Sequence, residues 1–358
     1  MIPVNYLPHR IVAAGSVVRR TTFAAFASCA LLIADPAAAK TTLAFSMWVP
    51  WNHPLIQAVY GRWVREVEAA SKGQITIRRL PKPVASPRAH LDAVRTGQAD
   101  LGFSVHGYSP KRFRAYFFAE FPMLGDDAVA TSVALWRTHQ KFFADKNLYQ
   151  GVKLIGVNMH GPGHIFHRTK HIKSPADLKG EKMRTGGPIP RMIVGAWGGV
   201  SIRQPAPKSY EILQTGIVDG ITFPWESVHS FRLLKLVPYA TEIPGGMYSS
   251  SHYLVMSQKK YAALSDAEKK VLAPFMGEGF ARLAGEGWNA RTAAGRSDAV
   301  KAGTKIINAP KAVTDAVKAM NGHFEKQYIA SVKAMGIDGR AVLDYFHAEV
   351  AKMKPVNK

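Results

Sequence analysis

Apolar and polar positions alternate along most of the chain in blocks that predict strands and helices in regular succession. Residues 41–48 form an extended apolar run, and residues 54–72 place apolar side chains at helical spacing before a closing glycine. Residues 74–80 alternate as a strand, residues 86–97 predict a second helix, and residues 99–105 predict a buried strand. This order predicts a parallel sheet with helices on its faces.

The later part of the chain repeats one piece of this pattern. Residues 91–103 predict a helix, a Thr-Gly stop, an aspartate and then an apolar strand, and residues 209–223 predict the same series. Residues 253–257 predict a strand returning between two halves, and after a capping box at residues 265–268 the chain is expected to be mostly helical. We therefore expect an α/β protein with two similar lobes that face one another.

Aromatic residues gather where the predicted strands end. Trp48 and Tyr108 follow strands of the first half, and Phe223, Trp225 and Glu226 lie at the end of a strand in the second half. Ligands in open α/β sheets meet the carboxyl ends of the strands. These residues therefore predict an aromatic-lined cleft, with the alternative that each of them belongs to the core or the surface.

One arginine is placed at a predicted strand end by strong local signals. Ser174 is a good helix N-cap, Gly180 ends that short turn, and an extended segment then runs through Arg184 into Gly186 and Gly187. A guanidinium beside such flexible backbone can grip a carboxylate through two parallel hydrogen bonds. The alternative is a solvated surface arginine.

The N-terminus has the layout of a secretory signal peptide. Basic residues precede an apolar run at residues 21–33, which is too short to span a bilayer, and an Ala-rich segment ends at Ala39. We expect cleavage after Ala39 and a periplasmic mature protein. Cys29 is the only cysteine of the chain and lies in the leader, so the mature protein is expected to have no disulfide and no thiolate chemistry.

The chain is strongly basic, with a formal net charge of +22. Removal of three arginines and one aspartate with the leader leaves +20. The basic residues are scattered, without the runs of five or six that nucleic-acid-binding arms contain. We interpret the charge as a solvated surface that favours acidic ligands, and we expect no nucleic-acid partner.

Motifs for metal binding and catalysis are weak. His160, His164, His167 and His171 suggest a metal site, but residues 164 and 167 face opposite sides of a strand and no carboxylate or cysteine joins them. No G-x-S-x-G or H-E-x-x-H motif is present. We expect no metal, no cofactor and no enzymatic activity.

Several stretches, in this order and spacing, resemble the extracytoplasmic solute receptors of tripartite ATP-independent periplasmic (TRAP) transporters, the C4-dicarboxylate-binding-receptor (DctP) family. They are residues 43–54 with His53-Pro54, residues 93–102, residues 174–184, residues 210–220 and Pro224-Trp225. The resemblance covers essentially all of the chain after the leader. It implies a two-lobed periplasmic-binding-protein fold, type II-like, with long C-terminal helices and the ligand enclosed between the lobes.

The resemblance also implies the chemistry of the site. In that family the arginine that matches Arg184 pairs with the ligand carboxylate. Members that carry a second arginine have it upstream, where this chain has His164, and Thr222 and Phe223 replace a Glu-Asn pair that is frequent in relatives. We therefore expect a monocarboxylate with an apolar or aromatic body. The predicted ligand-binding residues are Arg184, His164, Trp225, Trp48, Tyr108, Phe223, Glu226 and His53.

The function that follows from the resemblance is capture of an organic acid and its delivery to the small and large membrane subunits of a TRAP transporter. The alternatives are a ligand-binding protein that feeds a membrane signalling sensor, and a secreted enzyme. We expect a signal peptide at residues 1–39, lobe I at residues 40–162 and lobe II at residues 163–251. Residues 252–358 are expected to contribute a crossing strand and C-terminal helices shared between the lobes.

Overall fold

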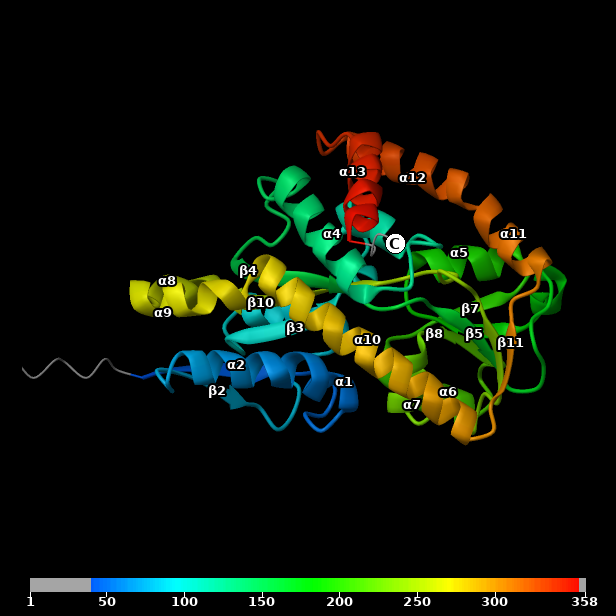
Figure 1. Ribbon diagram of the computed structural model, residues 1–358, viewed down its shortest axis with the longest axis horizontal. Coiled ribbons are helices and arrows are strands. Elements are labelled where there is room, and N and C mark those ends of the chain that lie inside the picture. Colours follow the sequence, from blue (N-terminus) through cyan, green and yellow to red (C-terminus); the bar gives the residue numbers. More distant parts are fainter. Residues whose placement is uncertain (1–39, 354–358) are drawn as a thin grey trace, which may run out of the picture. The chain divides into compact units, whose positions relative to one another are not determined.

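The protein is described by a computed structural model that covers residues 40–353 (Figure 1). The predicted leader and its cleavage site lie outside the described residues. Within this range, the first sheet has five strands in the order β2-β1-β3-β10-β4. They are β1 (Thr41–Ser46), β2 (Ile75–Arg79), β3 (Leu101–Val105), β4 (Val152–Met159) and β10 (Ser251–Ser257). Strands β1, β2 and β3 are parallel, whereas β10 runs antiparallel between β3 and β4.

Helices of the first half contact this sheet and bury the apolar stripe that the sequence predicts. In the predicted helix at residues 54–72, Trp63, Val64 and Val67 are completely buried. Strand β3 is buried along its whole length, as expected for a strand covered on both faces. The helical elements are α1 (Pro54–Ile56), η1 (Gln57–Gly61), α2 (Arg62–Ala70), η2 (Pro87–Ala89), α3 (His90–Arg95), η3 (His106–Tyr108), η4 (Arg114–Glu120) and α4 (Ala128–Phe142).

Six strands of the described chain form a second sheet in the order β11-β9-β5-β8-β6-β7. The strands are β5 (His164–His167), β6 (Lys182–Thr185), β7 (Val200–Arg203), β8 (Gly220–Phe223), β9 (Tyr239–Glu242) and β11 (Lys305–Asn308). Strand β6 is parallel to β7 and β8, whereas β5 is antiparallel to β8 and β9. The accompanying helices are η5 (Pro175–Leu178), α5 (Pro188–Ala196), η6 (Ala206–Lys208), α6 (Ser209–Gln214) and α7 (Trp225–Ser230).

The repeated helix–Thr-Gly–Asp–strand motif has the same structural role in both sheets. The Oδ2 atom of Asp100 accepts a hydrogen bond from the backbone N–H of Ala44 in β1, at 2.8 Å. The Oδ2 atom of Asp219 accepts one from the backbone N–H of Lys182 at the start of β6, also at 2.8 Å. Each aspartate thus joins the beginning of its own strand to the neighbouring parallel strand, which explains why the motif occurs twice.

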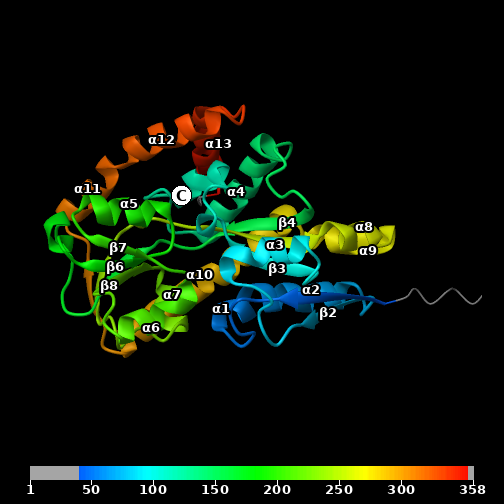
Figure 2. The same cartoon turned by 180° about the vertical axis from the view of Figure 1, so that it is seen from behind.

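The C-terminal part of the chain is mostly helical, as predicted, and its longest helix, α10, contacts elements of both lobes (Figures 1 and 2). Glycines permit this close approach. A Cβ atom at Gly285 would lie 2.5 Å from the Cα of Val129 in α4, and one at Gly295 would lie 2.6 Å from the carbonyl oxygen of Trp225 in α7. The helices are α8 (Gln258–Ala263), α9 (Asp266–Leu272), η7 (Ala273–Phe275), α10 (Gly277–Lys301), α11 (Lys311–Ala319), α12 (Asn321–Lys333) and α13 (Gly339–Lys352).

Replacing Gly295 with alanine is expected to destabilise the protein by about 1–2 kcal/mol, because the new methyl group meets rigid backbone of α7 and overpacking of this kind costs about 1–3 kcal/mol. Urea denaturation of the two proteins measures the difference. Gly322→Ala is the matched control, since nothing lies within 4 Å of a Cβ atom at that helical position. The control should be neutral or slightly stabilising, and an equal effect of both substitutions would contradict the packing argument.

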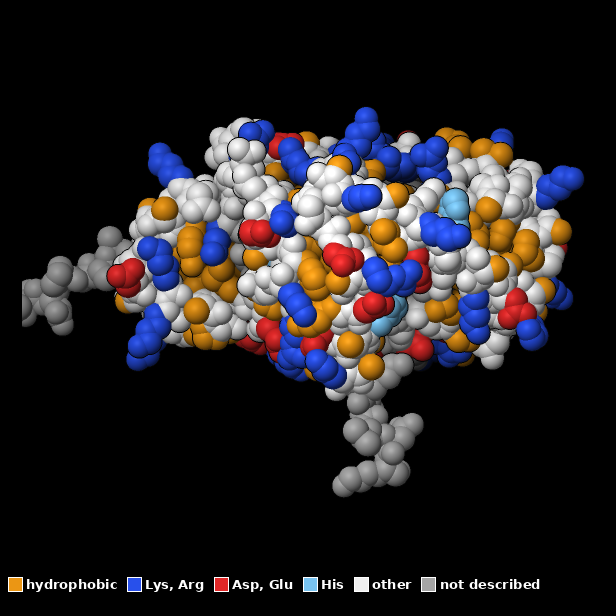
Figure 3. All heavy atoms as spheres, turned by 90° about the horizontal axis from the view of Figure 1, so that it is seen from above, with side chains coloured by type: hydrophobic (Ala, Val, Ile, Leu, Met, Phe, Trp, Pro, Cys, Tyr) orange, Lys and Arg blue, Asp and Glu red, His pale blue; other side chains and the backbone are white. Residues whose placement is uncertain are grey.

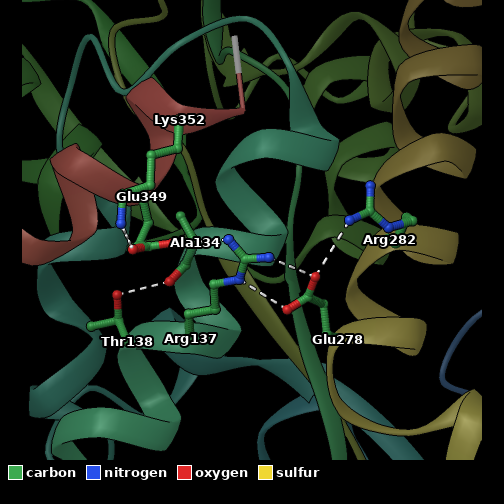
Figure 4. Close-up of polar contacts among 7 residues, drawn as sticks. All are labelled: Ala134, Arg137, Thr138, Glu278, Arg282, Glu349 and Lys352. Carbon is green, nitrogen blue, oxygen red and sulfur yellow. Dashed lines mark hydrogen bonds and ion pairs between the residues drawn. The ribbon is translucent and has the colours of Figure 1, made fainter.

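An ion-pair cluster joins the last helix to the rest of the protein (Figure 4). The guanidinium of Arg137 in α4 makes two hydrogen bonds to the carboxylate of Glu278 in α10, at 2.8 and 2.9 Å. Its Nη1 atom donates to Glu349 in α13 at 2.9 Å, and Glu349 also accepts from Lys352 at 2.6 Å. The bidentate geometry and the burial of Glu349 make this cluster stronger than an ordinary surface ion pair.

The predicted α/β class and two-lobed architecture with long C-terminal helices are confirmed, and β10, predicted as a strand returning between the halves, lies inside the first sheet. None of the helices within residues 40–353 is both long and apolar enough to cross a membrane. On the face shown in Figure 3, Lys and Arg side chains are dispersed among acidic and apolar ones, as the scattered charge of the sequence predicts.

Candidate functional site

A cavity of about 60 Å³ lies between the two sheets and is lined by residues from both. Much of its lining comes from residues at or within a few positions of the ends of strands β1, β3, β6 and β8, where parallel strands present their carboxyl ends. These lining residues are Trp48, Val49, Val105, Tyr108, Arg184, Gly186, Phe223 and Pro224. The site is therefore built by the sheet topology rather than by one local motif.

Arg184 is the buried cation of this cavity. Its side chain is only 1% exposed, and it occupies the third position of the four-residue strand β6, between β7 and β8. The guanidinium donates hydrogen bonds to two backbone carbonyl oxygens, that of Gln204 at 2.9 Å and that of Thr222 at 3.4 Å. Among the described residues, no carboxylate lies within ion-pair distance of it, and burial lowers its pKa. The charge is thus buried without an acidic partner.

Aromatic side chains surround the Arg184 guanidinium and the space beside it. The Cζ atom of Arg184 lies 4.2 Å from the centre of the Phe223 ring, in a cation–π arrangement. Trp48, which also lines the cavity, stacks with Phe103 at 4.8 Å and donates its indole N–H to the Phe103 carbonyl oxygen at 3.0 Å. This stacking and hydrogen bond hold the Trp48 ring in place, so the cavity has an apolar aromatic lining of fixed orientation there.

Two tyrosine hydroxyls complete the polar end of the cavity. The hydroxyl of Tyr108 accepts a hydrogen bond from the backbone N–H of Ala206 at 2.9 Å, and that of Tyr248 donates to the Thr222 carbonyl oxygen at 3.0 Å. Burial raises the pKa of Tyr248, which keeps the phenol neutral. Both rings are almost fully buried and line the same cavity as Arg184. The two tyrosines thus add hydrogen-bonding hydroxyl groups to the lining that contains Arg184.

Three histidines line the cavity as well, and burial holds each of them neutral. Burial lowers the pKa of His53 and of His160 to about 4, and that of His252 well below its usual range. The positive charge of Arg184 lowers the pKa of His160 further. At neutral pH these imidazoles offer one donor and one acceptor each, but no charge.

Six of the eight predicted ligand-binding residues line the cavity, namely Trp48, His53, Tyr108, Arg184, Phe223 and Glu226. The other two lie outside its lining. Trp225 begins α7, and its side chain enters the core of the second lobe, where it packs against Phe166 and donates its indole N–H to Glu242 at 2.7 Å. The Nδ1 atom of His164 accepts a hydrogen bond from the backbone N–H of Ile243 at 3.2 Å. In this structure the Trp225 side chain therefore faces the core of the second lobe and not the cavity lining.

The histidine-rich segment does not gather its side chains. His160 lines the cavity, His164 lies near Trp225, and the Nε2 atom of His167 lies 3.1 Å from Glu181. Within residues 40–353, no three His, Cys, Asp or Glu side chains come close enough together to hold a metal ion.

Several lining residues are not among the predicted ones, above all Tyr248, His252 and Trp288. Tyr248 precedes β10 in an irregular segment, and Trp288 lies in the middle of α10. Neither position has a local motif, and both reach the cavity only because β10 and α10 pack beside it. The only local feature beside Tyr248 and His252 is the run of three serines between them, residues 249–251, which does not define a geometry.

Hydrogen bonds hold the two sides of the cavity together. The Nη2 atom of Arg203 in β7 donates to the carbonyl oxygens of Gly107 and Tyr108, which follow β3 in the first sheet, at 3.0 and 3.2 Å. The Tyr108–Ala206 hydrogen bond also crosses between the lobes. The structure therefore has the lobes closed on one another around the site.

A buried carboxyl group lies beside these crossing contacts. Glu120, 2% exposed, lies so close to Gly107 and Gly187 that a Cβ atom at either glycine would come within 2.3 Å of a carboxyl oxygen. Its Oε2 atom accepts only a long hydrogen bond, of 3.4 Å, from the backbone N–H of Ile189. Burial raises the pKa of Glu120 to about 8, although Ile189 and the charge of Arg203 oppose the shift.

The fold and the site together define a two-lobed α/β solute-binding protein whose cavity lies between the lobes. The family model for bacterial extracellular solute-binding proteins, family 7 (DctP), matches residues 45–331. The chain belongs to this family, and it is a solute receptor of the TRAP class.

Solved structures and curated relatives agree with this assignment. A TRAP periplasmic solute-binding protein from Bordetella bronchiseptica with bound (R)- and (S)-mandelate is 37% identical, covers 88% of this chain and 100% of its own, and has a TM-score of 0.84. A marine-metagenome TRAP solute-binding protein specific for aromatic acids, in complex with 3-hydroxybenzoate, is 30% identical, with coverage of 87% and 98% and a TM-score of 0.81. The outer membrane transporter protein TsaT of Comamonas testosteroni is 27% identical over 93% of this chain and 98% of its own.

Proposed function

We propose that this receptor binds a small aromatic monocarboxylate in the cavity between its lobes and delivers it to the membrane subunits of a TRAP transporter. One observation carries the proposal: Arg184 is buried in the cavity lining against the face of Phe223, with no carboxylate partner among the described residues. A buried, uncompensated charge costs several kcal/mol. A ligand carboxylate that pairs with Arg184 would remove that cost and bind tightly as a result.

The composition of the lining supports a ligand with a single negative charge and an aromatic body. Among the described residues that line the cavity, Arg184 is the one arginine or lysine, and the histidines beside it are held neutral by burial. A second carboxylate would therefore meet no second cation. The rings of Trp48, Phe103 and Phe223 provide apolar faces on which an aromatic ligand can stack.

The relatives support the same ligand class. Mandelate in the Bordetella structure and 3-hydroxybenzoate in the marine-metagenome structure each carry one carboxylate on an aromatic body. We propose Arg184 as the carboxylate partner, with Tyr108 and Tyr248 as hydrogen-bonding groups and Trp48 and Phe223 as the aromatic walls. His164 and Trp225 support the second lobe from outside the cavity.

We also propose that the receptor is exported to the periplasm and that it leaves its ligand chemically unchanged. Cleavage of the leader after Ala39 would release the mature receptor into the periplasm, where TRAP membrane subunits accept ligand. We propose transport of the ligand without turnover, in line with the solute-binding family to which the chain belongs.

Mass spectrometry of ligand released by denaturing the purified protein, followed by a thermal-shift panel of organic acids, tests this proposal. Aromatic monocarboxylates at 100 times their Kd should stabilise the protein by about 2.7 kcal/mol, which raises its Tm by several degrees. The bound acid should be recovered chemically unchanged after incubation. Stabilisation by dicarboxylates or sugar acids alone would contradict the proposed ligand class, and turnover abolished by a substitution in the cavity would contradict the receptor function.

A further inference from the structure

His53 presents two unused hydrogen-bonding atoms at the cavity. Its side chain is 8% exposed and lines the cavity, and both ring nitrogens are buried with no hydrogen-bond partner among the described residues. A polar group buried without a partner is costly, and buried polar groups in native proteins are nearly always hydrogen-bonded. Both ring nitrogens of His53 are therefore available to hydrogen-bond a ligand that enters the cavity.

The position of His53 relative to Arg184 follows from a row of aromatic rings. Arg184 lies over Phe223 at 4.2 Å, and Phe223 stacks with Phe231 at 6.0 Å and 12° between the ring planes. His53 packs against Phe231 at 4.9 Å. Arg184 and His53 thus contact successive members of a pair of stacked phenyl rings, and all four residues line the cavity. A ligand whose carboxylate pairs with Arg184 could extend its body beside these rings to reach His53.

The surroundings of His53 define what kind of group it can accept. Burial and the charges of Arg291 and His229 keep the imidazole neutral, with a pKa of about 4. Glu226 lines the same cavity and is completely buried. Burial raises the pKa of its carboxyl group, and the charge of Arg291 opposes that shift. Its carboxyl accepts hydrogen bonds from the Ser227 and Ser230 hydroxyls. Arg291 lies outside the cavity lining, so a second ligand carboxylate would meet a neutral ring and an acidic side chain there. A hydroxyl group, by contrast, can both donate to and accept from a neutral imidazole.

We propose that His53 is a specificity-determining residue that hydrogen-bonds a hydroxyl group on the aromatic body of the ligand. The inference rests on the proposed function, which supplies the carboxylate at Arg184 and the ring along Phe223 and Phe231. A site that hydrogen-bonds a substrate hydroxyl discriminates strongly against the analogue without it, because the site's polar atoms then stay unpaired.

The test is calorimetric titration with benzoate, phenylacetate, their ring-hydroxylated isomers and benzene-1,4-dicarboxylate. On at least one of the two scaffolds, the best hydroxylated isomer should bind the wild-type protein about 10- to 100-fold more tightly than its unsubstituted parent. His53→Leu, which keeps a similar volume without polar atoms, should abolish that preference and leave the affinity for the parent acid within about threefold, since no hydrogen bond to the parent is lost. His53→Asn, which restores a donor and an acceptor, should recover part of the preference.

His323→Leu is the matched control, because His323 is an exposed histidine of α12 outside the cavity lining. It should retain the wild-type preference. If none of the monocarboxylates binds the wild-type protein, the proposed function itself fails. If they bind without any preference for a hydroxylated isomer, or if the preference survives in His53→Leu, the proposed function stands and the role of His53 is overturned. Tight binding of the dicarboxylate would also overturn it.

Discussion

Replacing Arg184 with alanine is expected to weaken ligand binding by about two to three orders of magnitude. The substitution leaves the ligand carboxylate desolvated without a charged partner, and breaking a buried pair in this way costs about 3–5 kcal/mol. Arg184→Lys keeps the charge but not the planar fork, so it should recover only part of the loss. Titration calorimetry of each variant with the identified acid measures both effects.

The same variants should leave folding almost untouched. Without ligand, Arg184 is a buried charge with no acidic partner among residues 40–353. Relief of that charge offsets the loss of its hydrogen bonds to two backbone carbonyl oxygens, so the Tm of the free protein should change little. Arg191→Ala is the control, because Arg191 is an exposed arginine of the neighbouring helix α5. It should bind like the wild type. Binding by Arg184→Ala within threefold of the wild type would mean that the carboxylate is held elsewhere.

Replacing Glu120 with glutamine is expected to change how stability depends on pH. The ordinary pKa of this carboxyl is 4.5, and burial raises it to about 8 in the folded protein. Between these values the unfolded chain has released a proton that the folded protein still holds. The free energy of unfolding therefore falls as pH rises through this window, by roughly 3–5 kcal/mol at most. Glutamine resembles the neutral form and removes this loss.

Urea denaturation of the wild type and Glu120→Gln at pH 5 and at pH 8 measures the effect. The two proteins should be similar at pH 5, and the variant should be more stable by a few kcal/mol at pH 8. Buried histidines such as His53 and His160, whose pKa is lowered to about 4, stabilise both proteins as pH rises from 4 to 6.5, so their contribution cancels in the comparison. Glu211→Gln, at an exposed position, is the control. A difference between Glu120→Gln and the wild type that stays constant from pH 5 to pH 8 would show that Glu120 is already ionised in the folded protein.

Much of the fold was predictable because its determinants are local. Helical spacing at residues 54–72 and the apolar run at residues 99–105 depend only on neighbouring positions, and both elements form as predicted. The repeated aspartates Asp100 and Asp219 mark equivalent strand starts in the two sheets. The position of Arg184 at the end of β6 also follows from local signals, namely a cap before it and glycines after it.

The orientation of side chains was less predictable, because it depends on packing. Trp225 and Glu226 are adjacent in the first turn of α7, where successive side chains point about 100° apart. Glu226 lines the cavity whereas Trp225 fills the core beside Phe166, and the sequence does not distinguish these outcomes. Tyr248 and Trp288 join the cavity from segments distant along the chain, which no local pattern could have indicated.

A crystal structure of the protein with its bound acid tests the central claim most directly. The account predicts an aromatic monocarboxylate in the cavity between the lobes, with both carboxylate oxygens about 2.7–2.9 Å from guanidinium nitrogens of Arg184 and the ring beside Phe223. A carboxylate held by other groups, with the Arg184 guanidinium still unpaired, would contradict it.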